Sequence, residues 1–259
     1  MEEDGYQRVN CRSSANILVI IAAGDRALAI AERRRLVARA MNDESPEILV
    51  PEMRLALAWS PPQLRAPLTT VFQLDRRLAR IVARTTEPML GQMRLAWWRE
   101  ALGKPVAERP RGDAVLDAIG RDWAAREASL VAMVDAWEVL VTSETLGRAE
   151  IEQFGRGRGA FFAALSDEDT EEAGALIAAA AFRWALADAA ASVSDPEEKA
   201  RLVEIGLSGG ATGDRLPKSL RGLAVLDALA ARALRRGGRP LMEGRGAPLA
   251  ALRAAIFLR

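Results

Sequence analysis

Histidine is absent from this chain of 259 residues, and cysteine occurs only once, at Cys11. Without histidine the chain has no imidazole general base, no histidine metal ligand and no Ser-His-Asp triad. A single cysteine excludes an intrachain disulfide and a metal site built from a cysteine cluster. Carboxylates, arginines and backbone groups are therefore the candidates for site chemistry.

The chain also lacks a large net charge, because its 36 basic and 35 acidic side chains leave a net charge of only +1. No global positive field attracts nucleic acid, so we expect no nucleic-acid partner. Only Lys104, Lys199 and Lys218 are lysines, and every other basic residue is an arginine. Arginine suits fixed carboxylate or phosphate contacts, but a coding bias toward arginine and alanine is the simpler explanation.

Long apolar runs are missing as well. The longest run near the start, Ile17–Ala23, is shorter than the roughly 20 residues that a membrane-spanning helix needs. The acidic residues at positions 2–4 differ from the basic start of a signal peptide. We therefore expect a cytoplasmic protein with no transmembrane segment. Residues 1–50 are predicted to form a poorly ordered N-terminal arm, with a short arginine-rich helix at Asp25–Met41.

Helical periodicity is what the sequence has in abundance. Half of the residues are apolar, and from Pro51 onward they recur at steps of three and four. No segment alternates as a strand would, so we predict one all-α domain over residues 51–259, a helical bundle of eight or more helices. The expected helices cover residues 53–58, 64–84, 89–102, 113–126, 130–146, 151–165, 167–193, 195 onward, 220–236 and 249–258.

Three details of these helices can be predicted. Two adjacent tryptophans cannot share one helix face, so one of Trp97 and Trp98 should enter the core. Gly147 suits the C-cap of the helix before it, and the glycines between 155 and 159 should break their helix or allow close packing. The residues expected on or near the inner side of the helix at 89–102 are Met89, Leu90, Met93, Trp97 and Trp98.

Two motifs resemble the squalene/phytoene synthase family. Phe72-x-Leu-x-Arg76 is similar to its aromatic-x-Phe-Cys-Arg run, and Arg94-Leu-x-Trp-Trp-Arg-Glu100 is similar to its Trp-Trp helix. The resemblance implies a helical bundle of the isoprenoid synthase type over roughly residues 50–258. Weaker similarity continues at Val134–Leu140, Phe154–Gly159 and Arg215–Pro217.

The resemblance also implies where a metal site would lie. In the family, aspartates on two facing helices hold Mg²⁺, which neutralises the diphosphate of the substrate. The first cluster maps to Ala79, Arg80 and Ala83, and none of these offers a carboxylate. In the second cluster Asp188 keeps one aspartate position and Ser192 replaces the other. These degenerate positions are expected to line a pocket with no catalytic residue and no metal.

Arg76 matches the arginine that the family places beside the diphosphate pocket. Together with Arg80 and Arg84 it forms a stripe with one arginine every four residues, which either binds an anionic group or is a solvated basic face. If this helix faces the helix that carries Asp188, we expect Arg80 to form an ion pair with Asp188 where metals would otherwise bind.

Other charged patterns have simpler interpretations. Asp113 and Asp117 form a literal DxxxD pair, but the position after a loop is typical of a helix cap. Asp135 and Glu138 share a helix face, and a structural role is favoured for both. Gly155-Arg-Gly-Arg-Gly159 lacks the preceding strand that a dinucleotide-binding loop requires.

The motifs together predict a non-catalytic protein, from a degenerate subgroup similar to a mitochondrial assembly factor for respiratory complex I. The resemblance implies a helper role in a biosynthetic process, through assembly, binding or a lipid-related function. No cofactor is expected. A protein partner or an isoprenoid or lipid ligand in the bundle cavity is implied, with peripheral contact to the inner membrane. The alternative is an active head-to-head prenyltransferase that uses Mg²⁺ to condense prenyl diphosphates. Such an enzyme should bring at least three carboxylates from two facing helices around one cavity.

Overall fold

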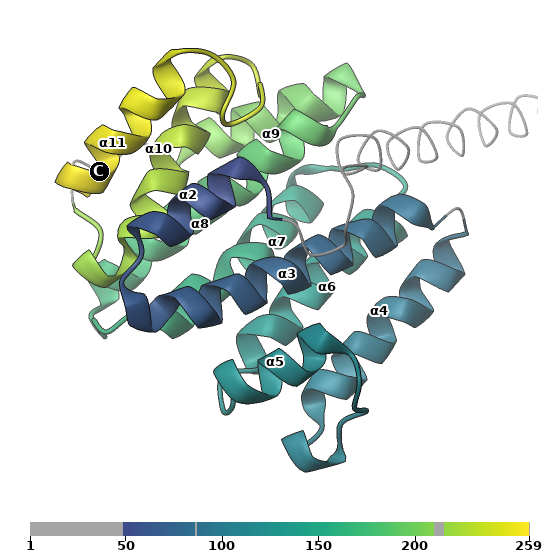
Figure 1. Cartoon of the computed structure of the whole chain (residues 1–259). Coiled ribbons are helices and arrows are strands. Elements are labelled where there is room, and N and C mark those ends of the chain that lie inside the picture. The colour runs from purple at the N-terminus through teal and green to yellow at the C-terminus, as the bar shows by residue number, and fades with distance from the viewer. Residues whose placement is uncertain (1–48, 86, 210–214, 259) are drawn as a thin grey trace, which may run out of the picture.

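Every regular element is a helix in the computed structural model, which describes residues 49–85, 87–209 and 215–258 (Figure 1). These residues contain ten α-helices, three short 3-10 helices and no strand, which confirms the all-α prediction. The tail and the arginine-rich helix expected within residues 1–48 lie outside the described residues. The α-helices are α2 (Pro51–Trp59), α3 (Pro62–Arg84), α4 (Pro88–Gly103), α5 (Ala114–Asp122), α6 (Ala128–Thr142), α7 (Arg148–Gly159), α8 (Glu171–Ser192), α9 (Pro196–Ser208), α10 (Arg221–Arg235) and α11 (Gly246–Phe257), and the 3-10 helices are η1 (Val106–Glu108), η2 (Ala160–Leu165) and η3 (Lys218–Leu220).

Local sequence signals set where several helices begin. The Asp113 side chain accepts hydrogen bonds from the first backbone N–H groups of α5, which confirms its interpretation as a cap. Asp195 caps α9 in the same way, and Thr170 caps α8. Gly147 was expected to end a helix, and this was wrong: α6 already ends at Thr142, and Gly147 is the N-cap of α7.

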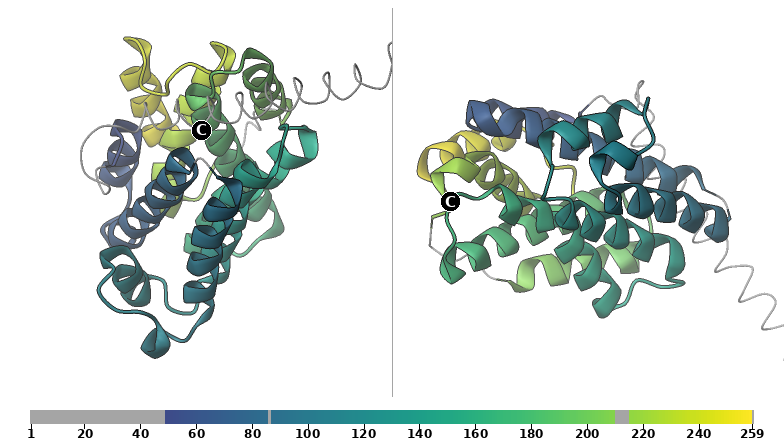
Figure 2. Two further views of the ribbon diagram at one scale, coloured as in Figure 1. Left: turned by 90° about the vertical axis from the view of Figure 1, so that its right-hand side faces the viewer. Right: turned by 90° about the horizontal axis from the view of Figure 1, so that it is seen from below.

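Helix α8 lies at the centre of the bundle and packs against α7, α9 and α10. Helix α6 packs on the other side of α7 and also contacts α3 and α4, while α2 lies on α10 (Figures 1 and 2). By length and composition, α8 is the one described helix that could cross a membrane. Ten of its residues are buried in the protein, so it serves as the core helix of the bundle.

The core joins residues from α2 through α11 into one hydrophobic cluster. At its centre, Phe72 of α3 contacts Phe161, Phe162 and Trp184, with ring centroids 6.1 to 6.4 Å apart in edge-on and tilted geometry. Aromatic pairs of this geometry add to the stabilisation from burial. Phe72, one of the residues that carry the resemblance, is therefore a core residue.

Helix α7 continues through Gly155 and Gly157 and ends at Gly159, where the chain passes into the 3-10 helix η2. The close packing expected at these glycines is confirmed. A Cβ atom at Gly157 would lie 2.6 Å from the carbonyl oxygen of Ala132 on α6. A Cβ atom at Gly159 would lie 2.7 Å from the Cβ of Ala181 on α8. The glycines thus let α7 approach both neighbours more closely than any other residue would allow.

Helix α4 differs from the expectation that its large apolar residues point inward. Trp98 is buried at 3% exposure, but Trp97 is 41% exposed, Met93 63% and Met89 71%. One tryptophan therefore enters the core, as predicted, and the two rings meet edge to face. The inner side of α4 is instead formed by Gly91, Leu95, Trp98, Ala101 and Leu102.

Candidate functional site

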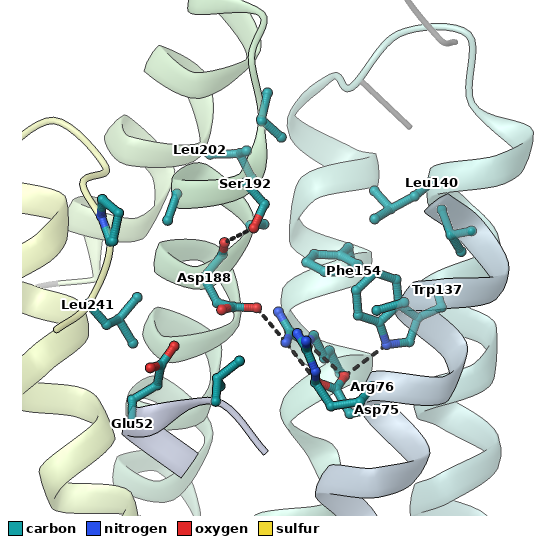
Figure 3. Close-up of a pocket in the computed structure, with 18 of the residues that line it drawn as sticks. Glu52, Asp75, Arg76, Trp137, Leu140, Phe154, Asp188, Ser192, Leu202 and Leu241 are labelled. Atoms are coloured by element: carbon teal, nitrogen blue, oxygen red, sulfur yellow. Dashed lines mark hydrogen bonds and ion pairs between the residues drawn. The ribbon is translucent and has the colours of Figure 1, made fainter. Parts of the chain in front are cut away.

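A pocket of about 400 Å³ opens among α2, α3, α6, α7, α8, α9 and the segment 240–243 (Figure 3). Its volume falls within the roughly 300–1,000 Å³ typical of small-molecule sites. Most of its wall is apolar, and a few charged groups converge at one side. The apolar wall includes Val82, Leu140, Ile151, Phe154, Leu202 and Leu241.

The charged side of the pocket is organised by the guanidinium group of Arg158 on α7. Its Nε and Nη2 atoms donate to the two carboxylate oxygens of Asp75 on α3, at 2.9 and 2.8 Å. Nη2 also donates to Oδ2 of Asp188 on α8 at 2.6 Å, and Nη1 donates to the carbonyl oxygen of Ala185 at 3.3 Å. One buried cation therefore holds carboxylates from two helices that lie on different sides of the pocket.

Aromatic rings surround this cation. The guanidinium carbon of Arg158 lies 5.0 Å from the ring centroid of Trp137 and 4.6 Å from that of Trp184, within cation–π range. Trp137 Nε1 also donates to Oδ1 of Asp75 at 2.9 Å. Burial alone would lower the pKa of Arg158, but the charges of Asp75 and Asp188 raise it above its ordinary value. The arginine is therefore always charged, and each of its three nitrogen atoms has a hydrogen-bond partner in the protein.

The pocket is also lined by two further charged side chains, Glu52 of α2 and Arg76 of α3, both only partly buried. Burial raises the pKa of the Glu52 carboxyl to about 7, and the negative charge of Asp188 adds to the rise. The charges of Arg76 and Arg158 act in the opposite direction. Within the described residues, Arg76 has no hydrogen bond or ion pair, and Glu52 has no ion pair.

Four of the six positions that sequence reasoning placed in a pocket line this one: Arg76, Ala79, Asp188 and Ser192. Arg80 and Ala83 are not among its lining residues. The Ser192 hydroxyl donates to the backbone carbonyl of Asp188 at 3.0 Å, so it is engaged by its own helix. Helices α3 and α8 therefore do contribute to one pocket.

The ion pair expected between Arg80 and Asp188 does not form. Asp188 binds Arg158 instead, at 2.6 Å. Arg80 has other interactions and points elsewhere than into the pocket wall. The physical reason lies in α7, whose glycines bring its backbone close enough to α8 for Arg158 to reach both aspartates.

The other charged patterns take structural roles. Asp113 caps α5 and also binds Arg77 of α3 at 2.9 Å. Asp135 and Glu138 of α6 both pair with Arg99 of α4. These ion pairs fasten α5 to α3 and α6 to α4, and none of the residues lines the pocket.

The carboxylates of the pocket do not fit Mg²⁺, the ion that the alternative function requires. Both oxygens of Asp75 and one oxygen of Asp188 accept hydrogen bonds from Arg158. A metal between these aspartates would meet the guanidinium group at the same place. In the part of the chain that the structure describes, no three residues of the histidine, cysteine, aspartate and glutamate types form a metal-binding group.

Sequence reasoning missed Glu52, Asp75, Trp137 and Arg158 as pocket residues. A signal for two of them was present in the apolar periodicity. Asp75 occupies the buried face of α3 between Val71 and Leu78, and Arg158 occupies the buried face of α7 after Ile151 and Phe154. Opposite charges on two apolar faces are expected to find each other, because an unpaired buried charge is costly.

A comparison of the chain with family models, with curated proteins and with solved structures finds no match.

Proposed function

We propose that the protein is a non-catalytic helical protein of the squalene/phytoene synthase type, with an isoprenoid synthase-type bundle. Its pocket binds an apolar molecule of isoprenoid or lipid type, and the protein acts as an assembly or lipid-related helper. The proposal includes the cytoplasmic location, the protein partner and the peripheral contact with the inner membrane that the resemblance implies. Two features of the pocket support it, its apolar wall and the way its carboxylates are used.

The observation that carries the proposal is the bridge from Asp75 through Arg158 to Asp188. Loss of diphosphate from a prenyl substrate develops negative charge, and electrostatic stabilisation of such charge is usually the largest catalytic contribution. Here the buried cation is already neutralised by two carboxylates, and those carboxylates are no longer available as metal ligands. A binding role makes no such electrostatic demand.

The apolar wall supplies the favourable free energy for a binding role. Transfer of apolar surface from water into such a wall contributes about 25 cal/mol for each Å² buried. Leu140, Ile151 and Leu202 come from three different helices. Their apolar side chains do not require hydrogen bonds from a ligand that contacts them. A flexible hydrocarbon or isoprenoid chain matches such a wall.

Filling the pocket tests this proposal. Ala79 and Ala83 lie one turn apart on α3, and both are buried, at 3% and 6% exposure, but only Ala79 lines the pocket. Equilibrium dialysis with radiolabelled farnesol should show binding to the wild type. Ala79→Leu should weaken it about tenfold or more, because the added methyl groups occupy ligand volume. Ala83→Leu, with a similar cost to packing, should bind farnesol as the wild type does.

An activity assay tests the alternative. Purified protein is incubated with labelled farnesyl diphosphate, NADPH and either Mg²⁺ or Mn²⁺, and apolar products are extracted. We expect no squalene-type or phytoene-type product above the level of a boiled control. A metal-dependent product would establish a prenyltransferase and overturn the non-catalytic proposal.

A further inference from the structure

Two arginine side chains line the pocket, and only one of them forms ion pairs with carboxylates of the described residues. Arg158 binds both Asp75 and Asp188. Arg76 lines the same pocket with no hydrogen bond or ion pair within the described residues. Figure 3 shows Arg76 and Glu52 on different walls, with Asp188 between them. An arginine with all of its donors available beside an apolar chamber is suited to a ligand oxyanion, which its planar fork can bind through two hydrogen bonds.

The number of charges around the pocket limits which oxyanion fits. Glu52, Asp75 and Asp188 provide three carboxylates, and Arg76 and Arg158 provide two cations. Glu243, a further carboxylate of the wall, is paired outside this group with Arg236 and Arg239. These charges sum to −1 when Glu52 is ionised and to zero when it is neutral, and Arg76 is the one cation of the set that is not held in an ion pair. A phosphate monoester carries about 1.5 to 2 negative charges at neutral pH, and a diphosphate carries more, whereas a carboxylate carries one.

We propose that the pocket takes a single-chain amphiphile with a carboxylate head, such as a medium- or long-chain carboxylic acid, and that Arg76 binds the carboxylate while the chain enters the apolar wall. This inference rests on the proposed binding function and names its ligand class. Glu52 then faces the head from the opposite wall. In its neutral form its carboxyl group can donate a hydrogen bond to a ligand oxygen, and in its ionised form it repels the head.

The affinity for a carboxylate should therefore fall as pH rises through about 7, the pKa to which burial raises Glu52. The other charged side chains of the pocket are Arg76 and Asp75 from α3, Arg158 from α7, Asp188 from α8 and Glu243 from the segment 240–243, and Asp188, Arg76 and Arg158 act on Glu52 through their charges. Arg158 holds Asp75 and Asp188 in fixed ion pairs, and Glu243 is paired elsewhere. Glu52 is the member of this set whose charge changes near neutral pH.

The test compares two probes that share a chain and differ in the head. Delipidated full-length protein is dialysed to equilibrium against labelled dodecanoic acid or labelled 1-dodecanol at pH 6 and pH 8. At pH 6 Arg76→Gln should weaken acid binding about tenfold or more, the size expected for a charge-assisted hydrogen-bonded pair. The same variant should change alcohol binding less than about twofold. Arg84→Gln, an exposed arginine two turns further along α3, is the matched control and should leave both affinities unchanged.

Glu52→Gln supplies the second arm, because its neutral amide cannot ionise. Acid binding to the wild type should weaken severalfold from pH 6 to pH 8, and binding to Glu52→Gln should stay nearly constant. Equal loss of acid and alcohol binding in Arg76→Gln, or no loss of either, would overturn the head-group assignment. If the alcohol still binds in that case, the binding function stands without it. If neither probe binds the wild type and farnesol also fails to bind, the proposed function itself is overturned.

Discussion

Arg158 on α7 and Arg76 on α3 line the same pocket, but they differ in burial and in hydrogen bonding. Arg158 is 2% exposed, and each of its three nitrogen atoms donates to an oxygen of the protein. Arg76 is partly exposed and has no such partner among the described residues. The comparison separates an arginine that holds three helices together from one whose charge remains available. Identical side chains in one pocket can thus serve the fold or a ligand, according to which carboxylates lie within reach.

The largest expected effect on stability comes from replacing Arg158, the arginine that is held in ion pairs. Arg158→Met leaves Asp75 buried without its cation, and breaking such a pair costs about 3–5 kcal/mol. Urea denaturation should show this loss, whereas Arg76→Met should change the free energy of unfolding by less than about 0.5 kcal/mol. Adding Asp75→Leu to Arg158→Met should restore part of the loss, because the fully buried carboxylate is then gone and only the partly exposed Asp188 remains. Equal losses in the two single variants would contradict the contrast between the arginines.

A smaller effect tests how α7 places Arg158 between its neighbours. Gly157→Ala would put a Cβ atom 2.6 Å from the Ala132 carbonyl oxygen, and such overpacking costs about 1–3 kcal/mol. Gly174→Ala on α8 meets no atom within 4 Å, so it should stabilise the protein by up to about 1 kcal/mol through helix propensity. Thermal unfolding of both variants gives the comparison. A neutral Gly157→Ala would show that close approach of α7 is not required.

The smallest expected effect concerns Glu52 and the pH dependence of stability. The folded-state pKa of Glu52, about 7, exceeds its ordinary value of 4.5, so the folded protein binds the proton more tightly than the unfolded chain does. The contribution of Glu52 is complete below about pH 4.5 and is lost as pH rises through 7. After allowance for solvent screening, we expect the wild type to lose about 1–2 kcal/mol relative to Glu52→Gln between pH 5 and pH 8. Denaturation curves that stay parallel across this range would contradict the raised pKa.

The sequence was sufficient to predict most of the helices. Apolar periodicity located α3 and α10, and the acidic or hydroxyl caps at Asp113, Thr170 and Asp195 marked where helices begin. These signals are local, because they depend on residues within one or two turns. Four positions taken from the resemblance lie along the pocket, because α3 and α8 both contribute to it.

The rest depends on contacts between segments far apart in the sequence. Helix α4 is apolar on more than one side, so periodicity alone could not show which side packs on α6, and the small residue Gly91 lies inside while Met93 lies outside. The bridge at Arg158 requires α3, α7 and α8 to meet at one point. The close approach of α7 to α8 at Gly155 and Gly159 depends on packing between helices and is not visible in the sequence of either helix alone.

The paired tryptophans of α4 also give the molecule an optical property. Trp98 lies in the core and Trp97 is in contact with solvent, yet their ring centroids are 5.2 Å apart. At that separation excitation absorbed by the buried indole passes readily to the exposed one, whose emission lies at lower energy because water relaxes around it. Emission from this pair therefore reports the surface of α4 rather than the core. A molecule that covers α4 would shift that emission to the blue while the fold beneath it stays unchanged.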